Sequence, residues 1–145
     1  MRSPDALKTI RLLSGALPRN VIVGASSVRT TSEVSSVRRA GGALVDSPVA
    51  DAQVIRRTKQ LGLLSLPSVS TPTEALSALQ HGADALKAFP AEQLPACVLR
   101  DWRSCLPAAA RLVLEWGAAQ QDASEHWDAG IAAVALGTLC EPGGA

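Results

Sequence analysis

A lysine lies within one of the apolar segments of this sequence of 145 residues. Lys87 interrupts the run Ala85–Phe89, which has the length of a buried strand. Burial disfavours a charged amine, so a lysine there needs a paired charge or a lowered pKa. A neutral amine attacks carbonyl carbons and forms Schiff bases. The ordinary alternative is an edge lysine whose ammonium reaches solvent along its aliphatic stem, and the residues alone leave both interpretations open.

Short aliphatic runs recur along the chain, and most are followed by a helical pattern. The runs are Val21–Val23, Ala43–Val45, Leu63–Leu66, Ala85–Phe89, Leu112–Leu114 and Ala132–Leu136. Thr30 and Thr71 each precede a glutamate by three residues, which is the capping-box spacing of a helix start. Gly41, Gly62 and Gly82 recur about every twenty residues, where helices should end.

This spacing predicts repeated βα units, because consecutive parallel strands need crossover helices of this kind. We expect a leading helix over about residues 4–15, six strands, and a helix within 94–107 that packs Trp102 against the sheet. Six such units are compatible with an open doubly wound sheet or with part of a (β/α)8 barrel. No Gly-x-Gly-x-x-Gly motif follows the first strand, which weakens a dinucleotide-binding interpretation.

Composition excludes several classes of function. The formal net charge is +1 with no basic block, so a nucleic-acid partner is not indicated. No apolar run approaches the ~20 residues of a membrane span, and the N-terminus lacks the apolar core of a signal peptide. Cys97, Cys105 and Cys140 are odd in number and lack metal-ligand spacing, which indicates reduced thiols in a cytoplasmic protein without a metal site.

Two stretches around Lys87 resemble those of a known enzyme family. Residues 66–75, LPSVSTPTEA, are similar to the Leu-Pro-Gly-x-x-Thr-Pro-Thr-Glu motif of 2-keto-3-deoxy-6-phosphogluconate and 6-phosphogalactonate aldolases, with Ser68 in place of the first glycine. Residues 85–92, ALKAFPAE, are similar to the family strand Leu-Lys-x-Phe-Pro-Ala, which bears a Schiff-base lysine. Weaker similarities extend over nearly the whole chain, at Gly24–Val28, Val45–Pro48, Ala129–Gly130 and Leu136–Thr138, and the segments Arg2–Leu7 and Val54–Arg57 favour the phosphogalactonate branch.

The resemblance implies an α/β fold of the TIM type. Residues 1–145 would form a single, incomplete (β/α) barrel domain of about six βα units, with the first two strands of the family missing. It also implies a homo-oligomer, usually a trimer, and a lyase that cleaves a keto sugar acid phosphate to pyruvate and glyceraldehyde 3-phosphate. No metal or organic cofactor is expected.

The same resemblance assigns site residues. Lys87 would be catalytic and form the Schiff base, and Ser27 takes the place of a threonine that helps to hold the pyruvyl group. The substrate-binding positions are Arg2, Ser27, Pro67, Gly117, Gly137 and Thr138. Of these, Gly117, Gly137 and Thr138 would offer amides or a hydroxyl to the phosphate, and Arg2 matches a substrate-binding arginine unless it is only a solvated terminal residue.

The chain departs from the family pattern in two places. The family's general acid–base glutamate lies four residues before the position of Arg2, which is ahead of Met1. Trp116 takes the first position of a Gly-Gly turn, where an indole would fill the phosphate pocket. Glu115 is a candidate substitute acid, while His81 and His126 suit capping or surface roles. The alternatives are therefore an inactive scaffold or subunit, or part of a longer enzyme whose start lies upstream.

Overall fold

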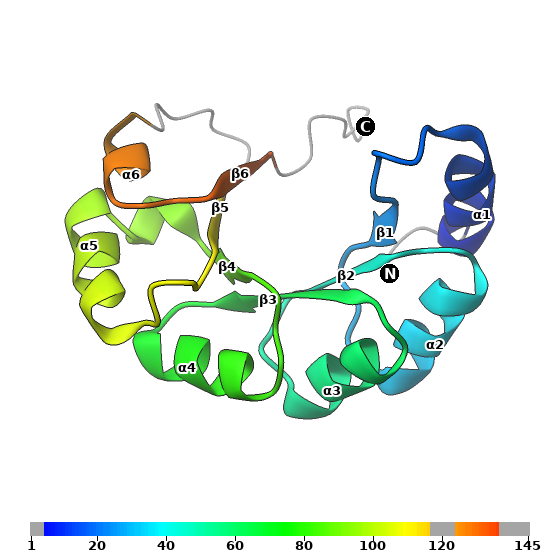
Figure 1. Cartoon of the computed structure of the whole chain (residues 1–145), viewed down its shortest axis with the longest axis horizontal. Helices are drawn as coiled ribbons and strands as arrows, with labels where there is room; N and C mark the ends of the chain where they lie inside the picture. Colours follow the sequence, from blue (N-terminus) through cyan, green and yellow to red (C-terminus); the bar gives the residue numbers. More distant parts are fainter. Residues whose placement is uncertain (1–4, 117–123, 137–145) are drawn as a thin grey trace, which may run out of the picture.

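Helices and parallel strands alternate along the chain in the computed structural model, which describes residues 5–116 and 124–136 (Figure 1). The helices are α1 (Ala6–Ala16), α2 (Thr31–Arg39), α3 (Ala52–Gln60), α4 (Pro72–Gln80), α5 (Ala96–Cys105) and α6 (Ser124–Asp128), with a 3-10 turn, η1, at Ala91–Gln93. The strands are β1 (Gly24–Ala25), β2 (Leu44–Ser47), β3 (Leu64–Val69), β4 (Leu86–Ala88), β5 (Leu112–Trp116) and β6 (Ala133–Leu136).

The six strands form one parallel sheet in the order of the chain, β1-β2-β3-β4-β5-β6. Figure 1 shows the strands on the inside of an arc and the helices on its outside, with β1 and β6 at the two ends. A doubly wound sheet would reverse its strand order and carry helices on both faces. The arrangement confirms the predicted βα repeat and matches the curvature of a (β/α) barrel rather than a doubly wound sheet.

The predicted helix starts at Thr30 and Thr71 are confirmed as complete capping boxes. The Thr30 and Thr71 hydroxyls each accept a 3.2 Å hydrogen bond from the backbone amide of the glutamate three residues later. In return, the Glu33 and Glu74 carboxylates accept from the threonine amides at 3.1 and 3.0 Å. Asp51 caps α3 and was not predicted as a cap. Its carboxylate accepts hydrogen bonds from two backbone amides at the start of this helix. These caps fix where α2, α3 and α4 begin after their strands.

One strand differs from its prediction. The run Val21–Val23 was expected to form the first strand, but the strand begins directly after this run and covers only Gly24–Ala25. Gly24 is in register with Leu44 of β2, and a Cβ atom at Gly24 would lie 2.4 Å from the Leu44 carbonyl oxygen. The close pairing of β1 with β2 therefore requires glycine, whereas Val21 and Ile22 are exposed before it.

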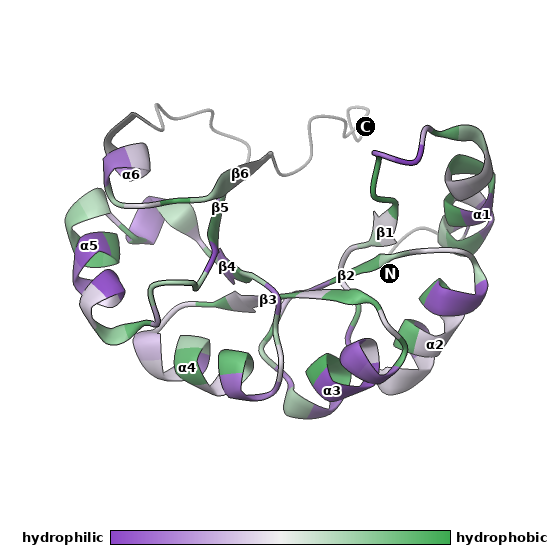
Figure 2. Cartoon of the chain, viewed as in Figure 1, coloured by the Kyte–Doolittle hydropathy of each residue, from purple (hydrophilic) through white to green (hydrophobic). Residues whose placement is uncertain are grey.

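The core lies between the sheet and the helix layer, and it comprises two clusters of buried aliphatic residues. Leu86, Ala88, Leu112 and Leu114 face the helices in the first cluster, together with Trp102 of α5, which is buried as predicted. Hydrophobic and hydrophilic residues alternate along the outer helices (Figure 2). Because successive strand residues point to opposite faces, the residues between these core positions point to the inside of the arc. No described helix is long and apolar enough to cross a membrane.

Candidate active site

The strand alternation of β4 directs Lys87 to the inside of the arc. Its neighbours Leu86 and Ala88 are fully buried in the core cluster that contacts the helices. Lys87 points the other way, yet only 5% of its surface is exposed. The side chain therefore does not extend to solvent as an edge lysine would, and its charge must be compensated by neighbouring groups.

Two carboxylates compensate the Lys87 ammonium. Its Nζ atom lies 2.6 Å from Oδ1 of Asp46 on β2 and 2.7 Å from Oε2 of Glu115 on β5. Val45 and Leu114, the residues before these acids, are fully buried core residues, so both acids point to the same inner face as Lys87. The structure thus brings together three ionisable side chains from three strands at one point inside the arc.

Burial raises the pKa of Asp46 above the ordinary value of 3.8. The Lys87 ammonium opposes this effect by hydrogen bonding and by its charge, while the negative charge of Glu115 reinforces it. A hydrogen bond from the Ser26 hydroxyl also favours the ionised form of Asp46. Asp46 is therefore a carboxyl group that takes up a proton more readily than an exposed aspartate does.

The loop after β1 reaches this cluster. Ser26 contacts Asp46, and the amide of Val28 donates a 3.1 Å hydrogen bond to the Asp46 carbonyl oxygen. Ser27 lies between them with a φ of 58°, in the left-handed region that non-glycine residues rarely adopt. Its hydroxyl lies 3.4 Å from that of Ser26. The loop places Ser27 near the cluster, and its assignment to substrate binding stays a prediction.

The other predicted substrate positions are dispersed. Arg2, Gly117, Gly137 and Thr138 lie outside the described residues. Pro67 is buried on β3. The next residue, Ser68, is the register partner of Lys87 and points to the inside of the arc. Successive strand residues point to opposite faces, so Pro67 points to the outer face. The structure therefore brings Lys87 and the Ser27 loop together, but it does not bring Pro67 to the inner face.

The two histidines have local roles. His81 forms the C-cap of α4, as the sequence analysis expected, and its Nδ1 atom lies 3.4 Å from Nη2 of Arg56. Nε2 of His126 lies 3.3 Å from the Leu94 carbonyl oxygen. Within residues 5–116 and 124–136, no group of three or more His, Cys, Asp or Glu side chains is arranged to hold a metal ion.

Asp46 was not predicted as a site residue, and Glu115 was predicted only as a candidate substitute acid. The segment Val45–Pro48 was interpreted as a strand end, without a role for its carboxylate. A usable signal was present, because Asp46 follows the apolar run Ala43–Val45 just as Lys87 follows Ala85 and Leu86. An acidic and a basic residue that both occupy inward positions of nearby buried strands are candidates for a buried ion pair.

A small cavity lies at the carboxyl ends of β2, β3 and β4. It has a volume of about 120 Å³ and is lined by Pro48, Val49, Ala50, Ser68, Val69, Ser70, Glu74 and Phe89. Ser68 is the register partner of Lys87, so the cavity adjoins the strand segment that carries the lysine. Active sites of (β/α) barrels form at this edge.

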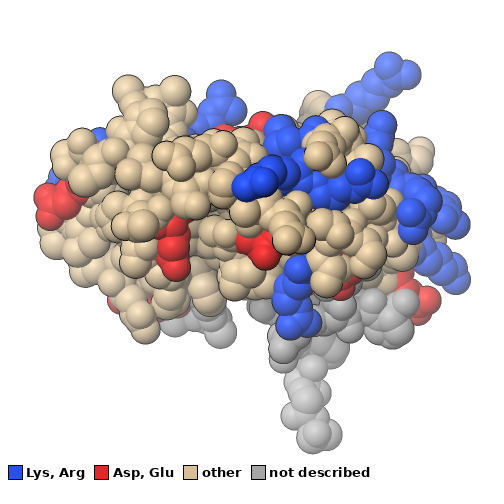
Figure 3. Space-filling view, turned by 90° about the horizontal axis from the view of Figure 1, so that it is seen from below, with Lys and Arg blue, Asp and Glu red and all other residues tan. Residues whose placement is uncertain are grey.

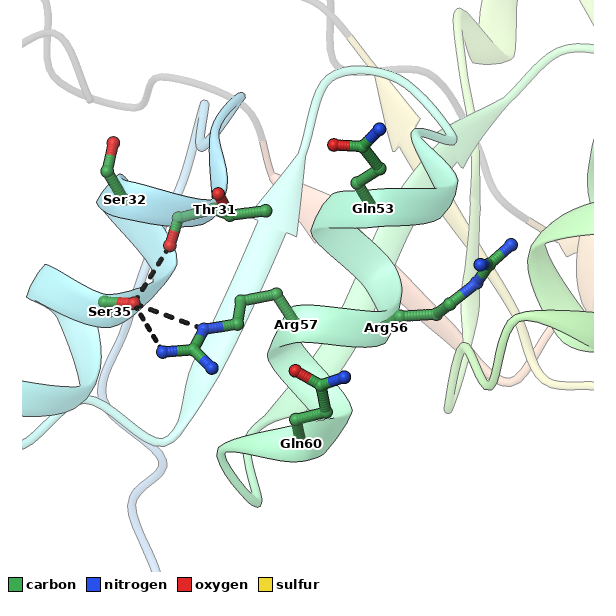
Figure 4. Close-up of a pocket in the computed structure, with 7 residues that line it drawn as sticks. All are labelled: Thr31, Ser32, Ser35, Gln53, Arg56, Arg57 and Gln60. Carbon is green, nitrogen blue, oxygen red and sulfur yellow. Dashed lines mark hydrogen bonds between the residues drawn. The ribbon is translucent and has the colours of Figure 1, made fainter.

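A larger hollow of about 470 Å³ lies between α2 and α3 on the outer helix layer (Figure 4). Basic side chains gather on this side of the molecule (Figure 3). The Arg57 guanidinium donates to the Ser35 hydroxyl at 3.2 and 3.3 Å, whereas Arg56 points away from Arg57 in the close-up. The two guanidinium groups do not converge on one position, so this groove lacks the arrangement of an anion site.

Comparison with known proteins identifies the family. The sequence profile of the KDPG and KHG aldolase family matches residues 1–105. The chain belongs to this family. A probable 2-dehydro-3-deoxy-6-phosphogalactonate aldolase of Rhizobium meliloti (strain 1021) is 33% identical over 144 residues, which cover 99% of this chain and 68% of that protein. The 2-dehydro-3-deoxy-6-phosphogalactonate aldolase of Escherichia coli (strain K12) is 29% identical and matches over 95% of this chain and 67% of its own length.

Solved structures agree with this KDPG and KHG aldolase assignment. A native KDPGal structure has a TM-score of 0.91 and 29% identity, and the match covers 99% of this chain and 70% of that one. A 4-hydroxy-2-oxoglutarate/KDPG-type aldolase described as from TTHB1 has a TM-score of 0.77 and 30% identity, with 94% and 67% covered. The resemblance noted in residues 66–75 and 85–92 is thus confirmed, and by resemblance the chain is an aldolase, a carbon–carbon lyase. It spans about two thirds of the length of these relatives.

Proposed function

We propose that this chain provides the Schiff-base lysine of a class I aldolase. The substrate is a 2-keto-3-deoxy-6-phospho sugar acid of the phosphogalactonate or phosphogluconate type, and the products are pyruvate and glyceraldehyde 3-phosphate. The observation that carries the proposal is the buried Lys87 amine, held between Asp46 and Glu115 on the inside of the strand arc. The names of the phosphogalactonate aldolases that resemble the chain support this substrate class.

The reaction begins when Nζ of Lys87 attacks the keto carbon of the substrate. Loss of water gives an iminium cation. The substrate's C4 hydroxyl then gives its proton to a carboxylate of the site, and the electron pair of the breaking C3–C4 bond moves to the iminium. The aldehyde product leaves, and the enamine that remains takes up a proton and is hydrolysed to pyruvate and free Lys87. This chemistry requires no metal or organic cofactor, because the protonated imine is the electron sink.

The buried position of Lys87 bears on two steps of this reaction, the attack of the amine and the survival of the imine. Attack on a carbonyl requires the neutral amine, so the Lys87 ammonium must lose one proton before the bond to the keto carbon forms. Exclusion of water around Lys87 then protects the imine from early hydrolysis.

Trapping with borohydride tests this proposal directly. Pyruvate and sodium borohydride should convert the imine to a stable secondary amine, which peptide mass spectrometry should locate on Lys87. The variant Lys87→Met should give no adduct at this position or elsewhere. Lys59→Met removes a lysine from a more exposed ion pair on α3 and should still form the adduct. A folded wild-type protein that gives no adduct would exclude the proposed chemistry.

The alternative is an aldolase-like scaffold that does not turn over by itself, or part of a longer enzyme. Among the described residues, β1 and β6 are not paired with each other, and large apolar side chains are exposed beside β1 at Leu12, Leu13, Leu17, Val21 and Ile22. Such surfaces and open strand edges favour association.

We therefore propose that residues 1–145 belong to one (β/α) barrel domain, in which the six described strands form an arc. We also propose that it forms a homo-oligomer, a trimer by family resemblance, in the cytoplasm. Sedimentation of the purified chain should show the oligomer. A monodisperse monomer that still forms the Lys87 adduct would contradict the oligomer and leave the chemistry in place.

A further inference from the structure

Lys87 has one carboxylate more than its charge requires. A single acid would neutralise the ammonium, but both Asp46 and Glu115 lie within 2.7 Å of Nζ. The side chains of these acids are only 15% and 24% exposed, so the second negative charge is also largely removed from water. A buried, uncompensated carboxylate is costly, and the stable arrangement of such a pair around one ammonium includes an extra proton.

The two acids differ in their surroundings. Asp46 is the more buried of the two, with 15% of its side chain exposed against 24% for Glu115. Burial and the negative charge of Glu115 both raise the pKa of Asp46. When the two carboxylates share one proton, the burial of Asp46 favours that proton on Asp46.

We propose that Asp46 is the proton-transferring acid–base of the Lys87 Schiff base, and that Glu115 is the permanent counter-ion of the lysine. This inference rests on the proposed aldolase function. It assigns the acid–base role to a residue of β2 that lies in direct contact with the reacting nitrogen, within the part of the chain that the structure describes.

The protons balance at each step of this reaction. The Lys87 ammonium first releases one proton to solvent while Asp46 keeps its own. The neutral Nζ then attacks the keto carbon, and a further amine proton moves to the substrate oxygen to give a carbinolamine. The Asp46 carboxylic acid then protonates the carbinolamine hydroxyl, which leaves as water and gives the iminium cation and the Asp46 carboxylate. With pyruvate, this carboxylate removes a proton from the C3 methyl group, so that the C–H electron pair forms the enamine and Asp46 is again protonated. In aldehyde cleavage, the Asp46 carboxylate takes the proton of the C4 hydroxyl as the C3–C4 bond breaks, and it then returns this proton to C3 of the enamine.

Deuterium exchange at C3 of pyruvate separates this role from a structural one. In D₂O the wild-type chain should exchange the methyl protons of pyruvate, as followed by proton NMR. Asp46→Asn should still form the borohydride adduct on Lys87 after long incubation, although more slowly. Its exchange rate should fall at least about 100-fold, because a positioned general base contributes roughly 10²–10⁴-fold. Asp46→Glu, which keeps a carboxyl group, should recover exchange relative to Asp46→Asn. Glu115→Gln should lose less than Asp46→Asn does, because it keeps the carboxyl group of Asp46 beside Nζ.

The outcomes distinguish this inference from the function on which it rests. A wild-type chain that forms no adduct contradicts the aldolase proposal itself. An adduct together with unchanged exchange in Asp46→Asn overturns the role of Asp46, and so does a larger loss in Glu115→Gln than in Asp46→Asn. Where the asparagine variant does not fold by circular dichroism, Asp46→Ser provides the same comparison with a smaller side chain.

Discussion

Nζ of Lys87 on β4 lies 2.6 Å from Oδ1 of Asp46 on β2, on the far side of the intervening strand β3. The contact is possible because both residues occupy inward positions of their strands and the sheet curves around them (Figure 1). With Glu115 from β5, the inner side chains of β2 and β5 hold one amine between them.

Removal of the ammonium should destabilise the fold. Lys87→Met leaves Asp46 and Glu115 as two partly buried carboxylates without a counter-ion, and we expect a loss of about 2–3 kcal/mol in the free energy of unfolding at neutral pH. Urea unfolding measures this loss. The control is Lys59→Met, because the Lys59–Asp84 pair has the same 2.7 Å distance but is about one third exposed. The control should lose under ~1 kcal/mol, and equal losses in both variants would contradict the buried pair.

Asp46 should give stability a specific dependence on pH. Its pKa is higher in the folded chain than in the unfolded chain, chiefly because of burial, so the folded state binds its proton more tightly. The stability that this proton contributes is fully present below the pKa of Asp46 in the unfolded chain, which is about 4. It is lost as the pH rises through the pKa of Asp46 in the folded chain.

The comparison with Asp46→Asn measures this effect. Urea unfolding at a series of pH values should show the wild type losing free energy of unfolding relative to the variant as the pH rises from about 4. Lys87 and Glu115, which face Asp46, are present in both proteins. A difference that is constant with pH, or one that grows in favour of the wild type, would show that the folded pKa of Asp46 is not raised.

Gly24 should be essential for the pairing of β1 with β2. A Cβ atom there would lie 2.4 Å from the Leu44 carbonyl oxygen and 2.8 Å from the Leu44 Cβ. Gly24→Ala should therefore cost about 1–3 kcal/mol, because backbone atoms must move to admit the methyl group. Gly15→Ala is the control: it lies in α1 with nothing within 4 Å of the added Cβ, and it should stabilise by roughly 0.5–1 kcal/mol. Thermal unfolding of the two variants should move in opposite directions.

The cap of α4 should contribute about as much as a typical N-cap. Thr71→Ala removes the hydroxyl that accepts from the Glu74 amide at 3.2 Å, and we expect a loss of about 1 kcal/mol. Thr73→Ala lies in the first turn of the same helix, where alanine has the higher helix propensity, so it should be neutral or slightly stabilising. Urea unfolding separates the two threonines, and a cap role for Thr71 would be excluded by equal effects.

Local chemistry in the sequence was sufficient to predict the elements. The capping boxes at Thr30 and Thr71, and the glycines at positive φ after α2, α3 and α4, mark helix ends through contacts between residues a few positions apart. The aliphatic runs therefore predicted the parallel strands, except that β1 begins after Val23. There the position of the strand depends on the contact between Gly24 and Leu44, which are not neighbours in the chain.

The candidate site likewise has features that the sequence predicted and features that depend on the tertiary structure. By itself, the sequence placed Lys87 in an apolar run of strand length and showed that the stretches around it resemble the KDPG-type aldolases, because both features lie in contiguous residues. Only the tertiary structure decided which acids meet the amine. Asp46 and Glu115 reach Lys87 through strand register and sheet curvature, and these depend on how six βα units pack together rather than on any local spacing.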